Sequence, residues 1–259
     1  MVTWKLFERM KGSKIEKELD HLVCFSEFEK NKYDNYIKIN NFHLLGSIIN
    51  NGFTTKWEKN NDVIYISQLR LNYKNNPILF NLNSNDYFHN NFYQIDKDLL
   101  PLVDKFCKKN NLNLIILGAG KSTNEEEFFY DILGHNDFIF KNKKGLSSYE
   151  IISKSRFIIS IDSTLGMESF ARKIPTVFFP ARYKYINEMS WRSGCETSKV
   201  SRNIWSEDID KINVDQILGY ISEISYKDFS NLWDNNYQKL MSYDKNNNSL
   251  KKLINSLIK

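Results

Sequence analysis

Residues 155–179, SRFIISIDSTLGMESFARKIPTVFF, decide the fold of this chain. The stretch reads as a strand, a turn of small polar residues, a helix, a proline stop and a second strand. Both strands are continuous apolar runs, which is typical of strands buried on both faces. We therefore expect two parallel strands joined by a helix.

The same alternation extends toward the N-terminus. From residue 63 the runs VIYIS, LNLIIL and DFIF read as strands, and DKDLLPLVDKFCKKNN and SSYEIISKS read as helices. Strands that alternate with helices build a parallel sheet covered on both sides. The predicted fold class is α/β, with a Rossmann-like parallel sheet that binds its ligand at the carboxyl edge.

The flanking segments are less regular. Residues 1–55 contain HLVCFSEFEKNKYDNYI, read as a strand and a helix, and NFHLLGSIIN, read as a short strand ending in a glycine turn. These residues are too few to form a second Rossmann-like domain. They are therefore either an addition to the main domain or the remnant of an N-terminal domain with its linker. Residues 56–259 are predicted to be the ligand-binding domain, with an irregular stretch after Pro180 and helices at its end.

Composition limits the classes of function. The formal charge of +5, from 36 basic and 31 acidic residues, is spread along the chain, so a nucleic-acid arm is not indicated. The three cysteines, Cys24, Cys107 and Cys195, are widely spaced and suggest neither a disulfide framework nor a metal site. This cysteine usage fits a reducing cytoplasm, where we expect the protein. Because no apolar run approaches a membrane span, any membrane association is expected to be peripheral, at the inner face.

One stretch resembles a phosphate-binding P-loop. LIILGAGKST, residues 114–123, ends in Gly-Lys-Ser, but the position five before Gly120 is Ile115, inside the apolar strand. The loop is too short to wrap a triphosphate with its backbone N–H groups. We interpret it as another loop at the carboxyl edge, with Lys121 at the surface.

The turn in the opening stretch is the stronger candidate for a phosphate site. Asp162, Ser163 and Thr164 stand where strand gives way to helix, and Gly166 permits close backbone approach. Orphan N–H groups and the helix dipole favour an anion there, although a simple N-cap is the competing interpretation.

Glu168 lies too far along the helix for a capping box. Met167, Phe170, Ala171 and Ile174 share one helical stripe, which leaves Glu168 off the core face. It could form a surface pair with Arg172 or accept hydrogen bonds from a ribose diol.

At this point ISIDSTLGMESFARKIPTVFF resembles the nucleotide-sugar half of GT-B glycosyltransferases, and more narrowly the O-antigen or surface carbohydrate biosynthesis proteins. HLLGSIINN, VIYISQLR, SRNIWSEDID and EISYKDFSNLW resemble flanking segments of that family in the same order, over residues 42–233. The resemblance implies a nucleotide-sugar donor, no required cofactor or metal, and a carbohydrate or lipid-linked saccharide acceptor. The site residues that it implies are Ser163, Thr164 and Gly166 at the phosphates, Glu168 at the ribose, Asp162 orienting the turn, and Ser67, Gln68 and Arg70 as a second phosphate clamp.

Departures from that pattern leave three functions open. GT-B enzymes have an N-terminal domain that commonly supplies the general base, and here only its last strand and helix are recognised. No catalytic residue is assigned, with His135 and Asp162 the nearest candidates for a base, and residues 138–140 could stack on a nucleobase or pack in the core. The leading hypothesis is a glycosyltransferase for surface polysaccharide; the alternatives are a sugar-nucleotide epimerase of the same architecture and a non-catalytic binding module.

Overall fold

A parallel five-stranded sheet forms the centre of the molecule. The computed structural model describes residues 18–34, 37–54, 57–69, 80–82, 85–87, 89–120, 124–142, 147–186 and 200–258. The strands lie in the order β7-β6-β3-β8-β9, and each neighbouring pair is parallel. Their bounds are β3 (Asp62–Ile66), β6 (Asn113–Leu117), β7 (Ile139–Lys141), β8 (Phe157–Ser160) and β9 (Thr176–Phe178). The predicted α/β class is confirmed.

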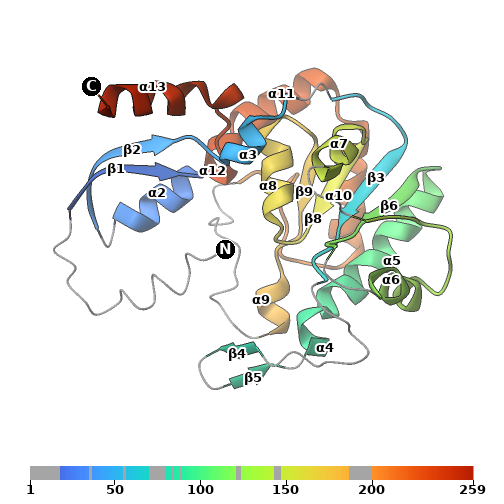
Figure 1. The fold of residues 1–259 in the computed structure, drawn as a ribbon. Helices are drawn as coiled ribbons and strands as arrows, with labels where there is room; N and C mark the ends of the chain where they lie inside the picture. Colours follow the sequence, from blue (N-terminus) through green and yellow to red (C-terminus); the bar gives the residue numbers. More distant parts are fainter. Residues whose placement is uncertain are drawn as a thin grey trace.

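Helices cover both faces of this sheet (Figure 1). Val63 and Tyr65 point into a core shared with α5 (Gln94–Lys109), α6 (Glu125–Leu133) and α10 (Lys211–Glu223). Ile64 and Ile66 point the other way, into a core shared with α7 (Ser147–Ser153) and α8 (Thr164–Ala171). Successive strand residues face opposite sides, so two covered faces require an apolar residue at every position. This explains the continuous runs in the sequence.

The strand order reverses between β3 and β8. From β3 the chain builds outward through β6 to β7, then crosses back to place β8 and β9 on the other side of β3. In open α/β sheets, ligands bind beyond the carboxyl ends of the strands at such a switch point. Two short helices, α4 (His89–Phe92) and α9 (Arg182–Tyr185), lie beneath this edge in the view of Figure 1.

The N-terminal elements, which we call the N-terminal unit, build a small sheet of their own. Strands β1 (Glu18–Cys24) and β2 (Lys38–Leu44) form a two-stranded parallel sheet, with α2 (Glu27–Asp34) between them in sequence and α3 (Ile48–Asn51) after them. The expected strand, helix and second strand are therefore present. The division of the chain near residue 55 stays a prediction.

The C-terminal segment returns to this N-terminal unit. After α11 (Tyr226–Asp234) and α12 (Tyr237–Leu240), the Ser242 amide donates to the Phe25 carbonyl at 2.7 Å, and the Asp244 amide donates to Asn51 Oδ1 at 3.0 Å. A 3₁₀ turn, η3 (Lys245–Asn247), leads into α13 (Asn248–Leu257), which is drawn above β2 in the view of Figure 1. A small hairpin of β4 (Phe80–Leu82) and β5 (Asn85–Tyr87) completes the described elements.

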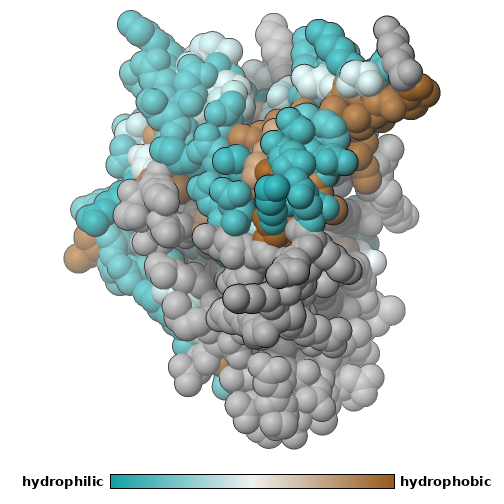
Figure 2. All heavy atoms as spheres, turned by 90° about the vertical axis from the view of Figure 1, so that its left-hand side faces the viewer, coloured by the Kyte–Doolittle hydropathy of each residue, from teal (hydrophilic) through white to brown (hydrophobic). Residues whose placement is uncertain are grey.

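Viewed from the side of the N-terminal unit, the surface mixes polar and apolar patches (Figure 2). The exposed large apolar side chains of the N-terminal unit and of the α13 segment are Leu19, Val23, Phe25, Ile48, Ile49, Ile254, Leu257 and Ile258. None of the helices within the described ranges combines the length and the apolar composition needed to cross a bilayer.

Candidate functional site

The predicted residues after β3 and after β8 meet at the switch point. Gln68 follows β3, and its Oε1 accepts a hydrogen bond from Arg182 Nη2 at 3.0 Å. Asp162 follows β8, and its Oδ2 accepts from Arg182 Nε at 3.0 Å. Arg182, at the start of α9, therefore joins two sequence-predicted site residues, although it was not itself predicted.

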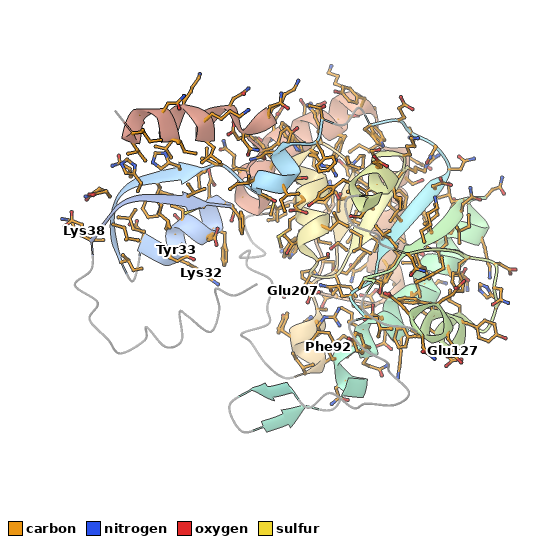
Figure 3. All side chains as sticks on the ribbon, in the orientation of Figure 1. Lys32, Tyr33, Lys38, Phe92, Glu127 and Glu207 are labelled. Carbon is orange, nitrogen blue, oxygen red and sulfur yellow. The ribbon has the colours of Figure 1, made fainter. Side chains whose placement is uncertain are left out.

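The Arg182 guanidinium is buried in a polar network. Its side chain is 1% exposed, lies over the Phe92 ring at 4.2 Å and donates to the Phe92 carbonyl; Figure 3 labels Phe92 beside α4 and α9. Asp96, at the start of α5, lies 3.5 Å from the guanidinium. Burial by itself lowers the pKa of Arg182, but the charges of Asp162 and Asp96 outweigh it and raise that pKa. The guanidinium is thus a fixed positive charge under the carboxyl edge.

Tyr65 extends the network into the sheet. Its hydroxyl donates to Asp96 Oδ1 at 2.7 Å. Burial raises the pKa of the Asp96 carboxyl even though Arg182 opposes this, and burial together with Asp96 raises the pKa of Tyr65. Tyr65 therefore stays a neutral hydrogen-bond donor, and the network holds the ends of β3 and β8 together.

The first turn of α8 presents open amide donors. Ser163 occupies the N-cap position with extended backbone (φ −77°, ψ 133°), but its side chain makes no capping hydrogen bond to a described residue. Thr164 is exposed. Within the described part of the chain, the amides of Thr164 and Leu165 have no hydrogen-bond partner. An anion at this tip would meet unsatisfied N–H groups and the positive end of the helix dipole.

Gly166 has a packing reason to be glycine. A Cβ atom at this position would lie 2.3 Å from Ser160 Oγ and 2.5 Å from Ser160 Cβ. The close approach that this glycine permits is therefore between α8 and β8. This contact sets how near the helix tip lies to the end of the strand.

Glu168 is buried instead of facing solvent. It is 7% exposed, and its Oε2 accepts a hydrogen bond from the Tyr149 hydroxyl of α7 at 2.9 Å. Arg172 is 5% exposed, with its guanidinium 5.1 Å from the Tyr149 ring centre. The surface location considered for a Glu168–Arg172 pair is wrong, because both side chains are buried and α7 covers this side of α8; the Glu168 charge still opposes the lowering of the Arg172 pKa by burial. Among the described residues, Glu168 Oε1 accepts no hydrogen bond.

The loop after β6 already holds an internal anion. Glu125, at the start of α6 and 2% exposed, accepts hydrogen bonds from the amides of Ala119 at 2.7 Å and Gly120 at 3.2 Å. The Ser67 hydroxyl donates to the same carboxylate. These donors are thus satisfied within the protein, and Ser67 is committed to Glu125. Arg70 and Lys121 lie outside the described residues.

We expect Glu125→Ala to lower the free energy of unfolding by about 1–3 kcal/mol, because buried donors lose their acceptor. Urea denaturation measures the effect. The matched control is Glu126→Ala, since Glu126 is the exposed next residue of the same helix. Equal losses in the two variants would show that the carboxylate does not organise this loop.

His135 lies at the opposite edge of the sheet. Its Nε2 is 3.1 Å from Asp104 Oδ2 and 2.7 Å from Lys108 Nζ, near the end of α5. That helix ends just before the amino end of β6, so the suggestion of His135 as a nearby base is wrong. Phe138 and Phe140 pack against the main core, with Phe140 6.4 Å from the Phe129 ring.

A family described as "putative O-antigen biosynthesis protein" matches residues 5–258. No curated protein matches the sequence.

Three solved structures are similar at low identity. A "putative UDP-N-acetylglucosamine 2-epimerase" from Listeria monocytogenes is 10% identical, with 76% of this chain and 45% of that chain covered and a TM-score of 0.46. S. aureus MnaA with UDP is 12% identical, with 89% of this chain and 57% of that chain covered and a TM-score of 0.45. The wall teichoic acid polymerase TagF is 12% identical, with 98% of this chain and 60% of that chain covered and a TM-score of 0.47. The chain spans between 45% and 60% of their lengths, and likeness at this level carries no argument about chemistry.

The family match covers nearly the whole chain and agrees with the resemblance of its strand-to-helix turn. The chain belongs to the O-antigen biosynthesis protein family.

Proposed function

We propose that this protein binds a nucleotide-activated sugar at the switch point and serves as a GT-B type glycosyltransferase in surface polysaccharide synthesis. The observation that carries the proposal is at the tip of α8, where Thr164 is exposed and the amides of Thr164 and Leu165 lack partners within the described chain. The alternative phosphate loop, after β6, has its donors filled by Glu125.

In this proposal the phosphates of the donor sit on the α8 tip. The Thr164 and Leu165 amides and the hydroxyls of Ser163 and Thr164 are the donors, and the helix dipole adds favourable potential. Gln68, from the segment after β3, is a further proposed phosphate ligand, as is Arg70, which lies outside the described residues. Such groups would stabilise the nucleoside phosphate as the sugar leaves for an acceptor hydroxyl, which is electrostatic catalysis.

Glu168 is the proposed ribose ligand. Tyr149 holds one carboxylate oxygen, Oε2, at 2.9 Å. The other oxygen, Oε1, is left for a ribose hydroxyl. A carboxylate fixed in this way loses little conformational entropy when it binds the diol.

The remaining parts of the proposal concern the acceptor and the location. Residues 1–55 belong to an N-terminal Rossmann-like unit and linker, and residues 56–259 carry the donor site. The acceptor is a carbohydrate or a lipid-linked saccharide, met in the cytoplasm or at the inner membrane face. No catalytic base is assigned among the described residues.

Thr164→Asp tests the donor site without harming the helix. An acidic residue in the first turn stabilises a helix through the dipole, but its carboxylate would repel a phosphate. Thermal shift and calorimetry with UDP, GDP, CMP and ADP measure binding. We expect at least one nucleotide to stabilise the wild type, and we expect Thr164→Asp to weaken it by roughly tenfold or more, which is at least about 1.4 kcal/mol.

Thr164→Asn is the matched neutral control and should bind within a few-fold of the wild type. Stabilisation by none of the four nucleotides would contradict the proposal. Incubation with the corresponding nucleotide sugar then separates the functions: transfer or donor hydrolysis supports the transferase, an epimerised sugar supports the epimerase, and no turnover supports a binding module.

A further inference from the structure

Helix α13 and its C-terminal cap carry an apolar stripe that the described part of the chain does not bury. Spacings of three and four residues place five side chains on one side of the helix: Leu250, Leu253, Ile254, Leu257 and Ile258. Leu257 is 55% exposed and Ile258 is 78% exposed. Among the described residues, none of the five belongs to either hydrophobic core or packs against one. The stripe therefore has its apolar face available for a partner.

The start of α13 is fixed to the body of the protein. The Asp244 carboxylate accepts hydrogen bonds from the Ser249 and Leu250 amides at 3.0 Å. Asn247, just before the helix, donates through Nδ2 to the Ile48 carbonyl of α3 at 3.0 Å. Helices shorter than roughly 12–15 residues are marginal in water on their own, so these anchors matter. The stripe is therefore presented in helical form before any partner binds.

Two isoleucines of α3 add exposed apolar surface near the start of α13. Ile48 is 56% exposed and Ile49 is 59% exposed. Asn51 of the same helix donates through Nδ2 to Asn247 Oδ1 at 3.0 Å, which ties α3 to the turn that precedes α13. Exposed apolar side chains thus come from two elements that are joined by hydrogen bonds.

The polar side of α13 is basic. Lys251 and Lys252 are exposed on the helix, and Lys245 precedes it. Residues 245–259 contain four lysines and no acidic residue, although the chain as a whole has 31 acidic residues. At about 100° per residue, Lys251 lies next to the edge of the stripe and Lys252 lies on the opposite side of the helix. An anionic surface would therefore be attracted to the same helix whose other face is apolar.

This combination favours a lipid surface over a protein partner. Helices that lie in a membrane interface place their apolar face at the acyl boundary and their lysines among anionic head groups. A protein partner would need roughly 800 Å² of surface on each side for a stable complex. A helix of ten residues is about 15 Å long and about 10 Å wide, so one face of α13 supplies only a small part of that area.

We propose that α13 docks the protein on an anionic membrane, with the helix lying flat in the interface and the stripe in contact with the lipid chains. Lysine stems can lie along the apolar surface while their ammonium groups reach the phosphate head groups. The inference goes beyond the proposed donor site, because no residue of the α8 tip takes part. Thr164→Asp should bind vesicles as the wild type does, so failure of the donor site and failure of this one are distinguishable.

Co-sedimentation of the full chain with vesicles tests the proposal. One set of vesicles contains phosphatidylcholine alone, and the other contains phosphatidylcholine and phosphatidylglycerol in equal parts. We expect saturable binding to the mixed vesicles, and binding at least roughly tenfold weaker to phosphatidylcholine alone, because the attraction of the lysines is lost. Added salt should weaken binding to the mixed vesicles, since it screens exposed charges.

Ile258→Gln should weaken binding to the mixed vesicles by roughly tenfold, the scale of one large apolar side chain that no longer enters the lipid. Ile212→Gln is the matched control, because Ile212 is 70% exposed on α10 and lies outside the stripe. The control should bind as the wild type does. Urea denaturation should show both variants to be as stable as the wild type, since both side chains are exposed.

Lys251→Gln/Lys252→Gln should weaken binding to the mixed vesicles by roughly tenfold or more, at about fivefold for each lysine near an anionic surface. Lys211→Gln/Lys227→Gln is the control of equal charge, with exposed lysines of α10 and α11.

Three results in the vesicle assay would overturn the inference. They are no binding to the mixed vesicles, equal binding to phosphatidylcholine alone, and equal losses in a variant and its control. A dimer in analytical ultracentrifugation that Ile258→Gln dissociates would also overturn it, because the stripe would then contact a second copy of the chain.

Discussion

Arg182→Gln will lower the free energy of unfolding by about 3–5 kcal/mol, because it leaves buried carboxylates without their cation. Asp162 and Asp96 are 4% and 2% exposed, and both face the guanidinium. Removing one partner of a buried ion pair costs far more than the pair contributes as a whole. Urea denaturation at neutral pH measures the loss.

The pH dependence of this variant follows from Asp96. Burial already raises the pKa of this carboxyl in the folded protein, and Arg182 opposes the rise. Without the guanidinium the folded-state pKa rises further above the unfolded value, so the folded state binds more protons. The variant should therefore regain stability, relative to the wild type, as the pH falls from neutral toward the unfolded-state pKa of Asp.

Lys184→Gln is the control for Arg182→Gln. Lys184 lies two residues after Arg182 in the same helix, and its pair with Asp208 is exposed. Exposed ion pairs contribute little to stability, so the free energy of unfolding of this variant should be close to that of the wild type. A similar loss of unfolding free energy in both variants would mean that the burial of the Arg182 network is not the reason for its contribution to stability.

Gly166→Ala will destabilise the protein by about 1–3 kcal/mol through overpacking between α8 and β8. The added Cβ would collide with the Ser160 side chain, at 2.3 Å from Oγ and 2.5 Å from Cβ. Both atoms disappear in Ser160→Gly. The double variant Gly166→Ala/Ser160→Gly should therefore be more stable than the sum of the two single effects predicts.

A double-mutant cycle by denaturant unfolding measures this coupling. A coupling of about 1 kcal/mol or more would establish that the glycine is required for packing. Additive losses would mean that Gly166 is needed for some other reason, such as approach of a ligand.

The sheet could be predicted from the sequence because strands covered on both faces need hydrophobic residues at consecutive positions, and such runs are recognisable in the sequence itself. Residues 63–66 of β3 and 157–159 of β8 are uninterrupted hydrophobic runs, and parallel strands bring their carboxyl ends to one edge of the sheet. Gln68 and Asp162, far apart in the chain, therefore lie close enough to share Arg182 as a hydrogen-bond partner, while their role at a phosphate stays a prediction.

Other contacts depend on tertiary neighbours that no local pattern specifies. Glu125 accepts hydrogen bonds from the Ala119 and Gly120 amides in the loop after β6. The sequence did hold a signal for this contact, namely an acidic residue at the start of a helix that follows a glycine-containing loop. The partners of Arg182 come from several different elements, so its network could not be read from a local pattern. Its position just after a buried strand was nevertheless a signal, since the same kind of position had marked Asp162 as a candidate. Glu168 was misplaced because its helical stripe says nothing about α7, which covers that side.

A crystal structure of the protein with the nucleoside diphosphate that gives the largest thermal shift tests the central claim most directly. The account predicts phosphate oxygens within hydrogen-bonding distance of the Thr164 and Leu165 amides, at the start of α8. A diphosphate bound instead to the Ala119–Gly120 amides with Glu125 displaced, or bound away from the ends of β3 and β8, would contradict it.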